Sequence, residues 1–451
     1  MMIVLNLGLG MNPALVGLLG AIPRLTDAFT DPMMGYISDN ARTRWGRRRP
    51  FIFAGAIIAA IFFALLWQLP SGQSENFYFI YFLVGSLLFY LGYTIFATPW
   101  VALGYELTPD YHERTRLMGT QFFIGNLAYV VSPWFLWIMN SGTFFRNSVG
   151  EPDQVAGAAR LAIIIAVVTI GLGILPAIFL RERMKDIALA ELGAKAVTGV
   201  VKNLTEFFKG FFVTLRSKSF LKLCVATFMV FNGFILISAF SSYVIIYYVC
   251  GGDQELGARY VGWAGSLGAV STFAVIAFVT WIGTRIGKRR AFFIATGLSI
   301  VGYSLKWICY NPDLPWLVLV PAPLLAFGLG GLFTLLPAMV ADVVDLDELN
   351  THERREGMYG SIFWWVVKLG MAAALAGGGY LLNATGFDVA LAGEQTDRAI
   401  FLMRFFDMGI PIVASAIAIW AIATYPITEQ KAREVREQLE QCRGTGQEAT
   451  A

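Results

Sequence analysis

Two carboxylates and a guanidinium lie on one stripe of an otherwise apolar stretch near the start of the chain. Arg24, Asp27 and Asp31 are spaced i, i+3 and i+7, which on a helix places them within about 60° of one another. An ionisable side chain at membrane depth costs roughly 3 kcal/mol on insertion scales. Such a cost indicates a functional role, and the stripe therefore predicts the binding of a cation in a transport pathway.

The two carboxylates allow two cation chemistries. Hard cations take oxygen ligands, so Asp27 and Asp31 form a candidate Na⁺ site. Alternatively, they share a proton, because like charges close together raise one pKa. A static buried salt bridge that only fixes helix packing is the structural alternative. Arg24 either orients one aspartate or extends its guanidinium toward water.

The composition indicates that these charges lie in a membrane protein. Of 451 residues, 57% are hydrophobic and 14% are charged, whereas soluble domains carry about 25% charged residues. The mean hydropathy is +0.62. The chain is therefore expected to be an all-α integral membrane protein whose partner is the lipid bilayer. Its net charge of +3 is too small to indicate nucleic-acid binding.

The sequence offers little material for enzyme chemistry. It contains two histidines, and its four cysteines show no paired spacing. Neither a catalytic triad, a disulfide framework nor a His-ligated metal is indicated. We expect a protein that is not an enzyme and has no cofactor beyond a coupling ion, H⁺ or Na⁺.

Apolar segments long enough to cross a bilayer recur along the chain. We expect helices near residues 13–38, 51–69, 77–104, 117–140, 159–180, 219–248, 259–283, 291–310, 315–341, 358–383 and 399–425. Basic residues gather in alternate loops, around 42–49, 181–218 and 285–290 and after 425. The positive-inside rule assigns those loops to the cytoplasm, so the protein is expected to be a multi-pass protein of the cell inner membrane.

Two short motifs recur at nearly the same offset. The stretch 45–51, WGRRRPF, returns as IGKRRAF at 286–292, and the HER of 112–114 returns at 352–354. A parallel repeat of this length predicts the major facilitator fold, with two pseudo-symmetric six-helix bundles and a site between them. The expected parts are an N-terminal bundle at 1–180, a cytoplasmic linker at 181–218, a C-terminal bundle at 219–425 and a tail at 426–451. At this offset the helix at 219–248 has no full counterpart, so the first helix is expected to be truncated.

The membrane charges do not follow the repeat. Asp27 and Asp31 correspond to Gly268 and Thr272 in the second half, which favours ligand or ion chemistry over a shared scaffold role. Lys368 lies in the middle of an apolar helix and needs a counter-charge. Pairing with either aspartate across the two halves would couple cation binding to closure; a static salt bridge is again the alternative.

Other charged residues lie at helix ends and in basic loops. They indicate a cytoplasmic gate, or alternatively charges that only set the topology; the candidates are Asp39, Arg47, Arg48, Glu113, Arg114, Arg289, Arg290, Glu353 and Arg354. Arg404 and Asp407 are spaced i, i+3 and are expected to form a structural pair. Lys306, near a helix end, is expected to extend toward water.

The stretch 24–35, RLTDAFTDPMMG, followed by RWGRRRP at 44–50, resembles the second-helix signature of the melibiose-permease type. That group is the glycoside–pentoside–hexuronide:cation symporters of the major facilitator superfamily. The pair Tyr93-Thr94, the HER loops and Val366-Val367-Lys368 extend the resemblance over nearly the whole chain.

The resemblance implies sugar transport driven by Na⁺ or H⁺. It assigns Asp27 and Asp31 to the cation site, Thr94 to the edge of that site, and Lys368 to the link between cation and sugar. Two positions depart from the pattern: Ala97 stands where an acidic residue is expected, and Gln121 where an arginine is expected. The lost oxygen ligand at Ala97 favours H⁺ over Na⁺.

Three functions remain open from the sequence. The first is a monomeric symporter of a glycoside or other small carbohydrate, with Lys368, Arg24, Gln121 and Trp365 in coupling and substrate binding. Trp365 lies one turn before Lys368, where a ring could stack on a sugar, although such rings more often serve packing. The second is a carrier of an amphiphile such as a lysolipid on the same fold. The third, a sensor or membrane enzyme, would need a regulatory domain or catalytic constellation that the sequence does not display.

Overall fold

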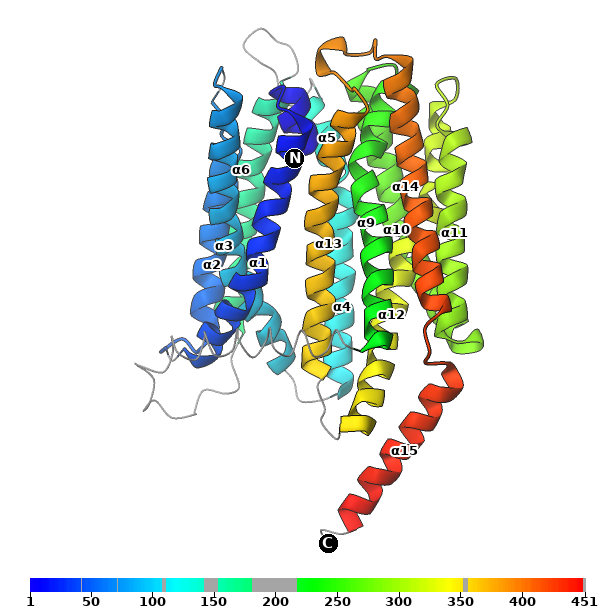
Figure 1. The fold of residues 1–451 in the computed structure, drawn as a ribbon. Helices are drawn as coiled ribbons and strands as arrows, with labels where there is room; N and C mark the ends of the chain where they lie inside the picture. The colour runs from blue at the N-terminus through cyan, green and yellow to red at the C-terminus, as the bar shows by residue number, and fades with distance from the viewer. Residues whose placement is uncertain are drawn as a thin grey trace. The chain divides into compact units, whose positions relative to one another are not determined.

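The computed structural model describes residues 1–41, 43–70, 72–107, 111–141, 153–180, 217–351 and 356–448. These residues form helices joined by turns, and no strand occurs among them (Figure 1). The prediction of an all-α fold is confirmed. The chain divides into two compact units, residues 1–206 with 375–391 (unit 1) and residues 207–374 with 392–451 (unit 2). The boundary at 374–375 falls inside one helix, α13 (Glu356–Ala384).

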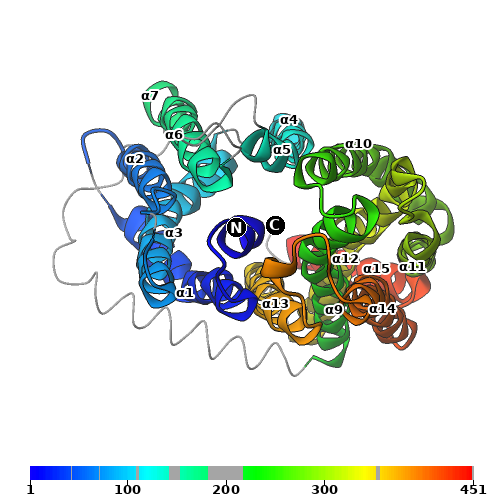
Figure 2. The same cartoon turned by 90° about the horizontal axis from the view of Figure 1, so that it is seen from above.

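Unit 1 is organised around α3, which packs against both α1 and α2 (Figure 2). Its elements are η1 (Val4–Gly8), α1 (Pro13–Asn40), α2 (Arg49–Leu66), α3 (Glu75–Glu106), α4 (Tyr111–Val131), α5 (Trp134–Asn140), α6 (Gln154–Gly173), α7 (Leu175–Phe179) and η4 (Val389–Leu391). Glycines bring α2 and α3 together: a Cβ on Gly55 would lie 2.4 Å from the amide nitrogen of Phe96, and one on Gly92 2.7 Å from that of Ala59. Only glycine permits so close an approach of the two backbones.

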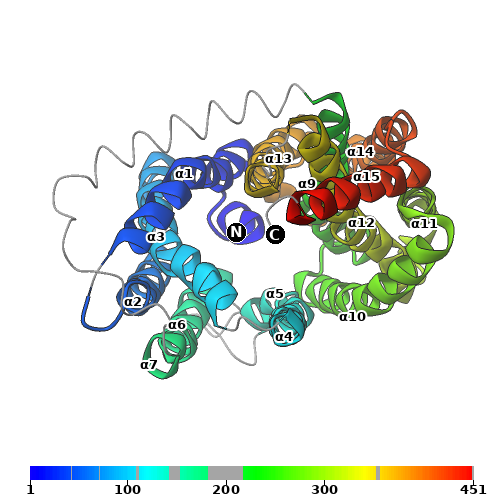
Figure 3. The same ribbon diagram turned by 90° about the horizontal axis from the view of Figure 1, so that it is seen from below.

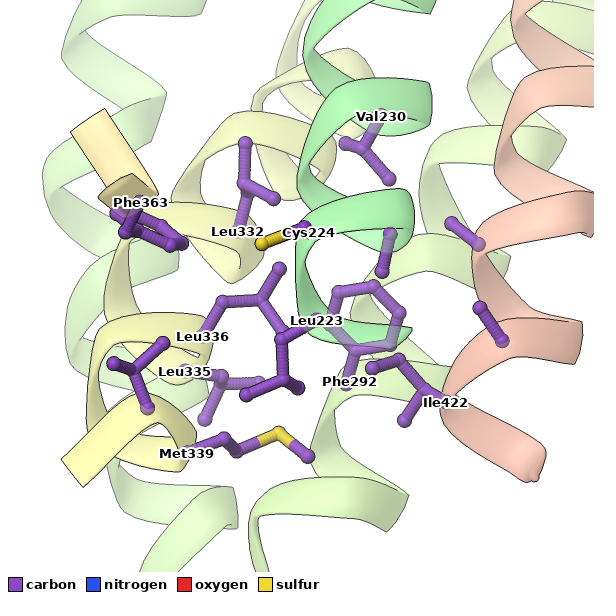
Figure 4. Packing of buried hydrophobic residues seen from close by; sticks show 14 of the residues in the cluster. Leu223, Cys224, Val230, Phe292, Leu332, Leu335, Leu336, Met339, Phe363 and Ile422 are labelled. Atoms are coloured by element: carbon purple, nitrogen blue, oxygen red, sulfur yellow. The ribbon is translucent and has the colours of Figure 1, made fainter. Parts of the chain in front are cut away.

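Unit 2 is built around α12, which packs against α9, α10 and α11, while α14 packs against α9 and α11. Its elements are α9 (Lys218–Tyr243), η2 (Val244–Val249), α10 (Gln254–Ile286), α11 (Lys288–Cys309), η3 (Pro315–Leu319), α12 (Ala322–Thr351), the first part of α13, α14 (Asp397–Ala423) and α15 (Glu429–Glu448). Its core side chains come from α9, α10, α11, α12, α13 and α14. Figure 4 shows part of this core, including Leu223, Phe292, Leu336, Phe363 and Ile422. The polar helix α15 contacts α12 and buries Val435 and Leu439 (Figure 3).

The internal repeat is visible in the backbone. Gly46 and Gly287, equivalent positions of the two motif copies, both have positive φ, 113° and 87°, and each lies just before a helix. This conformation strongly favours glycine. Asn12 and Asp253, at the same offset, are the N-cap residues of α1 and α10 and accept hydrogen bonds from the first turn of each helix.

Two irregularities also recur. The π-helices η1 and η2 each end shortly before those two capped helices, α1 and α10. Pro99 lies inside α3 and Pro337 inside α12. A helix can cross a membrane without a π-helical turn or an internal proline. Their presence in both halves therefore supports the duplication that the sequence predicts.

Helix boundaries differ from the expectation where prolines interrupt. The single helix expected at 117–140 ends at Val131 and resumes at Trp134, after Pro133. The one expected at 159–180 breaks at Ile174, before Pro176. Proline lacks the N–H that an unbroken helix would need there. Within the described residues, nine helices are long and apolar enough to cross a membrane, and the charged α1 and α4 are not among them.

Candidate cation site

A hydrogen bond joins the charged stripe of α1 to α3. Oγ1 of Thr94 donates to Oδ1 of Asp31 over 3.0 Å. Thr94 is 2% exposed and Asp31 is half-buried. Thr26 and Thr30, on α1, instead donate back to carbonyls of their own helix, whereas the Thr94 hydroxyl reaches across to a carboxylate. The pair places a carboxylate and a hydroxyl oxygen side by side, which are ligands of the kind that hard cations take.

Asp27 lies one turn before Asp31 and is 3% exposed. Nη1 of Arg24 lies 3.7 Å from its Oδ2. The guanidinium also lies over the ring of Tyr90 on α3, with Cζ 4.5 Å from the ring centroid. Arg24 therefore turns toward the aspartate and the ring, which favours the orienting role over extension toward water.

Aromatic side chains of α3 continue from this contact. Tyr93 is 45% exposed, stacks on Phe89 with ring centroids 6.3 Å apart, and meets Tyr90 edge-on. Tyr129 of α4 is also exposed. Exposed phenol rings beside a charged stripe could contact a polar substrate.

Pro99 lies inside α3, close to the Thr94–Asp31 pair. It lies five residues after Thr94 and has no N–H to pair with the carbonyl of Ile95. A freed carbonyl at membrane depth is tolerated where protein or a polar cavity surrounds it. The carbonyl of Ile95, next to the Thr94–Asp31 pair, therefore lacks the i+4 amide donor that an uninterrupted helix would supply.

The other expected substrate residues lie elsewhere. Gln121 is half-buried on α4 in unit 1. Lys368 is half-buried on the part of α13 that belongs to unit 2. Trp365 packs against the hydrophobic core of unit 2. The pairing of Lys368 with Asp27 or Asp31 stays a prediction.

The basic residues at helix starts have a packing role. Arg289 donates to the carbonyl of Ala423 at the end of α14. Arg49 donates to the carbonyls of Ala177 and Ile178, at 2.6 and 3.0 Å, at the end of α7. Arg49 and Arg289 lie within one position of each other in the repeat. Each donates to the last carbonyls of the final helix of its half, α7 for Arg49 and α14 for Arg289.

The other gate candidates differ in their burial. Arg48 is buried, Arg47 is half-buried and Arg290 is exposed. The remaining candidates lie outside the described residues, by their side chains for Asp39, Glu113 and Arg114 and entirely for Glu353 and Arg354.

An ion pair not anticipated from sequence joins helix ends in unit 2. Nζ of Lys288 lies 2.7 Å from both carboxylate oxygens of Asp342 and 3.0 Å from the carbonyl of Ala338. Lys288 opens α11 and the other two residues lie on α12. The basic motif copy at 286–292 could have pointed to this lysine, but its partner is 54 residues away.

The expected pairing of Arg404 with Asp407 is wrong. Asp407 instead binds Lys306, with 2.9 Å between Nζ and Oδ2. Arg404 donates to the carbonyl of Trp307 over 2.7 Å and lies between the rings of Trp307 and Tyr248. The i, i+3 spacing places both residues on one side of α14, and that side faces α11, where each finds its partner. Lys306 is consequently buried and does not extend toward water.

The chain is similar to several known proteins over nearly its whole length. Residues 4–429 match the family model described as MFS/sugar transport protein. The glucuronide carrier protein homolog of Escherichia coli K12 is 24% identical over 428 residues, covering 94% of this chain and 87% of the relative. The isoprimeverose transporter of Lactiplantibacillus pentosus is 25% identical over 423 residues, covering 93% and 82%.

A further relative has a different cargo in its name. The sodium-dependent lysophosphatidylcholine symporter 1 of Gallus gallus is 23% identical over 462 residues, covering 96% of this chain and 83% of the relative. Among solved structures, a bacterial homolog of the human lysosomal transporter Spinster, in an inward-facing conformation, has a TM-score of 0.67 at 16% identity and covers 94% of this chain and 91% of that chain. That likeness shows the major facilitator fold.

Proposed function

Because the chain belongs to the MFS/sugar transport protein family and to its glycoside–pentoside–hexuronide:cation symporters, we propose that it couples H⁺ or Na⁺ movement to the symport of a glycoside or other small carbohydrate. Family membership also makes it a multi-pass transporter of the inner membrane and not an enzyme. Transport proceeds by alternating access between two helix bundles.

The observation that carries this proposal is the contact of Asp31 with Thr94 beside the Arg24–Asp27 pair. Two carboxylates and one guanidinium leave the stripe with one net negative charge. One monovalent cation neutralises it, which lowers the cost of holding these charges in a low-dielectric surrounding. Oxygen ligands suit Na⁺, and a shared proton would achieve the same neutrality.

Coupling to substrate is assigned to Lys368. Its ammonium competes with the cation for Asp27 or Asp31, so ion binding releases it toward the substrate. Trp365 and Gln121 complete the substrate contacts in this scheme, and the exposed Tyr93 supplies a ring beside the cation site. No cofactor other than the coupling ion is required, and a monomer suffices.

A lysolipid or similar amphiphile is the second candidate cargo. It is favoured by the lysophosphatidylcholine symporter among the relatives and by the departure at Gln121, which removes a charged contact that a sugar hydroxyl could use. In that relative the ion named is sodium, whereas Ala97 favours H⁺ here.

The two cargoes are separated by uptake into right-side-out membrane vesicles that contain the full chain. Labelled glucuronides, glycosides of pentoses and lysophosphatidylcholine are tested with Na⁺ or choline outside, with and without a proton gradient. We expect accumulation of one glycoside that depends on one of the two gradients. Accumulation of lysophosphatidylcholine that excess glycoside does not compete with would favour the amphiphile carrier.

A further inference from the structure

Unit 2 holds a charge network at membrane depth that the proposed transport site does not use. Nζ of Lys306 donates to Oδ1 and Oδ2 of Asp407, at 3.0 and 2.9 Å, and to Oγ of Ser241. Ser241 in turn donates to Oδ1 of Asp407 over 2.7 Å. The side chains of Lys306 and Asp407 are 3% and 2% exposed.

The network is closed around the ammonium. A lysine ammonium has three N–H donors, and the acceptors are the two carboxylate oxygens and the serine hydroxyl. The charges of lysine and aspartate cancel. Such an arrangement meets the condition under which a buried ion pair is tolerated, because geometry and hydrogen bonding offset the loss of hydration.

Three helices contribute to this network. Ser241 lies near the end of α9, Lys306 near the end of α11, and Asp407 in α14. The ring of Tyr310 lies 5.4 Å from Nζ, and Tyr303 and Tyr310 are both buried. The π-helix η2 begins three residues after Ser241, and π-helical turns frequently mark functional sites.

The chemistry matches that of the cation site in unit 1. In both places a carboxylate lies beside a hydroxyl, Asp31 with Thr94 on one side and Asp407 with Ser241 on the other. In unit 2 an ammonium of the chain itself occupies the position between the oxygens.

We propose that Asp407 and Ser241 form a cation site specific for a primary ammonium, which Lys306 fills from within the chain, and that this occupancy fixes α9, α11 and α14 as one rigid block. The site is not a second site for the transported ion, because the Lys306 ammonium already occupies the position between its oxygens. The proposal does not depend on the transported substrate or on the coupling ion.

Chemical rescue tests the site directly. Lys306→Ala removes the atoms of n-propylammonium, leaving a cavity of that shape beside Asp407. We expect the Tm of the purified full-length protein in detergent to fall by about 5–10 °C. Addition of n-propylammonium at roughly 10–100 mM should restore at least half of that loss, since a ligand of the native state stabilises it by RT ln(1 + [L]/Kd).

Matched variants isolate the ammonium. Lys306→Met loses the same charge but fills the cavity with its own side chain, so its Tm should not respond to n-propylammonium. Tetramethylammonium has the charge but no N–H donors, so it should not rescue Lys306→Ala. Lys222→Ala, which removes a lysine that donates to the Thr424 carbonyl, should show no amine response.

The proposal is overturned if Lys306→Ala is as stable as the wild type, if n-propylammonium fails to rescue it, or if tetramethylammonium rescues it equally. If Lys306→Ala does not fold, the cycle of Lys306→Met with Asp407→Leu gives the answer. A double variant more stable than Asp407→Leu, which leaves a buried ammonium unpaired, supports the site; a double variant less stable than both singles contradicts it.

Discussion

Thr94 donates its hydroxyl hydrogen to Oδ1 of Asp31 over 3.0 Å, and this bond links α3 to the charged stripe of α1. If the pair holds the coupling ion, Thr94→Val removes one oxygen ligand and leaves Asp31 without this donor. We expect the cation concentration for half-maximal uptake to rise roughly tenfold or more, because a hydrogen bond to a charged group contributes about 1.5–3 kcal/mol. Thr94→Ser, which keeps the hydroxyl, should remain near the wild type.

The repeat provides the control for that measurement. Thr272 is the counterpart of Asp31 in the second half and donates to the Gly268 carbonyl of its own helix over 2.9 Å. Thr272→Val should leave the half-saturating cation concentration unchanged. Equal effects of Thr94→Val and Thr272→Val would mean that the Thr94 contact is only one of packing.

The guanidinium of Arg24 lies over the ring of Tyr90 as well as beside Asp27. The ring centroid lies 4.5 Å from Cζ, while the ion pair itself is 3.7 Å long. Without the ring, Arg24 is expected to close onto Asp27 and to compete with the cation. Tyr90→Leu should therefore weaken cation binding about tenfold in uptake assays, whereas Tyr90→Phe keeps the ring face, loses only the hydrogen bond of the hydroxyl with Arg24, and should have a smaller effect. Phe77→Leu, on the same helix, serves as the control.

Glycine at 379 is required for the packing of α13 against α1 in unit 1. A Cβ there would lie 2.1 Å from the carbonyl oxygen of Pro13 and 3.1 Å from Cα of Gly17. Gly379→Ala should lower the Tm by roughly 3–10 °C, because overpacking of a tight contact forces the backbones apart. Gly360→Ala, on the same helix with open space around it, should be neutral or slightly stabilising. If the contact between α13 and α1 is loosely packed, Gly379→Ala and Gly360→Ala will have the same melting curve.

Labelling of Cys250 can test the orientation of the chain in the membrane. It lies in the turn between η2 and α10, which the positive-inside rule places outside the cell, whereas Cys442 lies in the cytoplasmic tail. Burial and the nearby Asp253 carboxylate raise the pKa of the Cys250 thiol to about 11. In single-cysteine variants, a membrane-impermeant maleimide added to intact cells should label Cys250 and not Cys442.

The same pKa sets the rate of that labelling. Only the thiolate reacts, so between pH 7 and pH 9 the rate should rise about tenfold per pH unit. A rise of only about threefold between pH 8 and pH 9 would indicate a thiol with an ordinary pKa. Labelling of Cys442 alone would show that the chain has the opposite orientation in the membrane.

The sequence predicted those features that are local or repeated. Arg24, Asp27 and Asp31 share a stripe because the helical period determines their spacing, and α1 is an unbroken helix through all three. The duplication was visible in two motifs and recurs in the backbone as the matched Gly46 and Gly287. The place of Thr94 beside Asp31 could be predicted only from the family resemblance, since no local sequence pattern relates residues 63 positions apart.

The missed contacts are those that depend on which faces of distant helices meet. The i, i+3 rule paired Arg404 with Asp407, but the side of α14 that carries both faces α11, and Lys306 is 101 residues away in sequence. Lys306 was expected near water because it lies close to a helix end. In the structure a carboxylate and a hydroxyl are within its reach inside unit 2, so the ammonium stays buried.

The central claim is that the carboxylates of α1 bind the ion that drives transport. The most direct test is the accumulation ratio of the glycoside identified in the uptake panel, measured in energised vesicles with wild type, Asp31→Asn and the exposed-loop control Asp313→Asn. We predict that the wild type and Asp313→Asn concentrate the substrate, and that Asp31→Asn only equilibrates it across the membrane. Undiminished, gradient-dependent accumulation by Asp31→Asn would contradict the account.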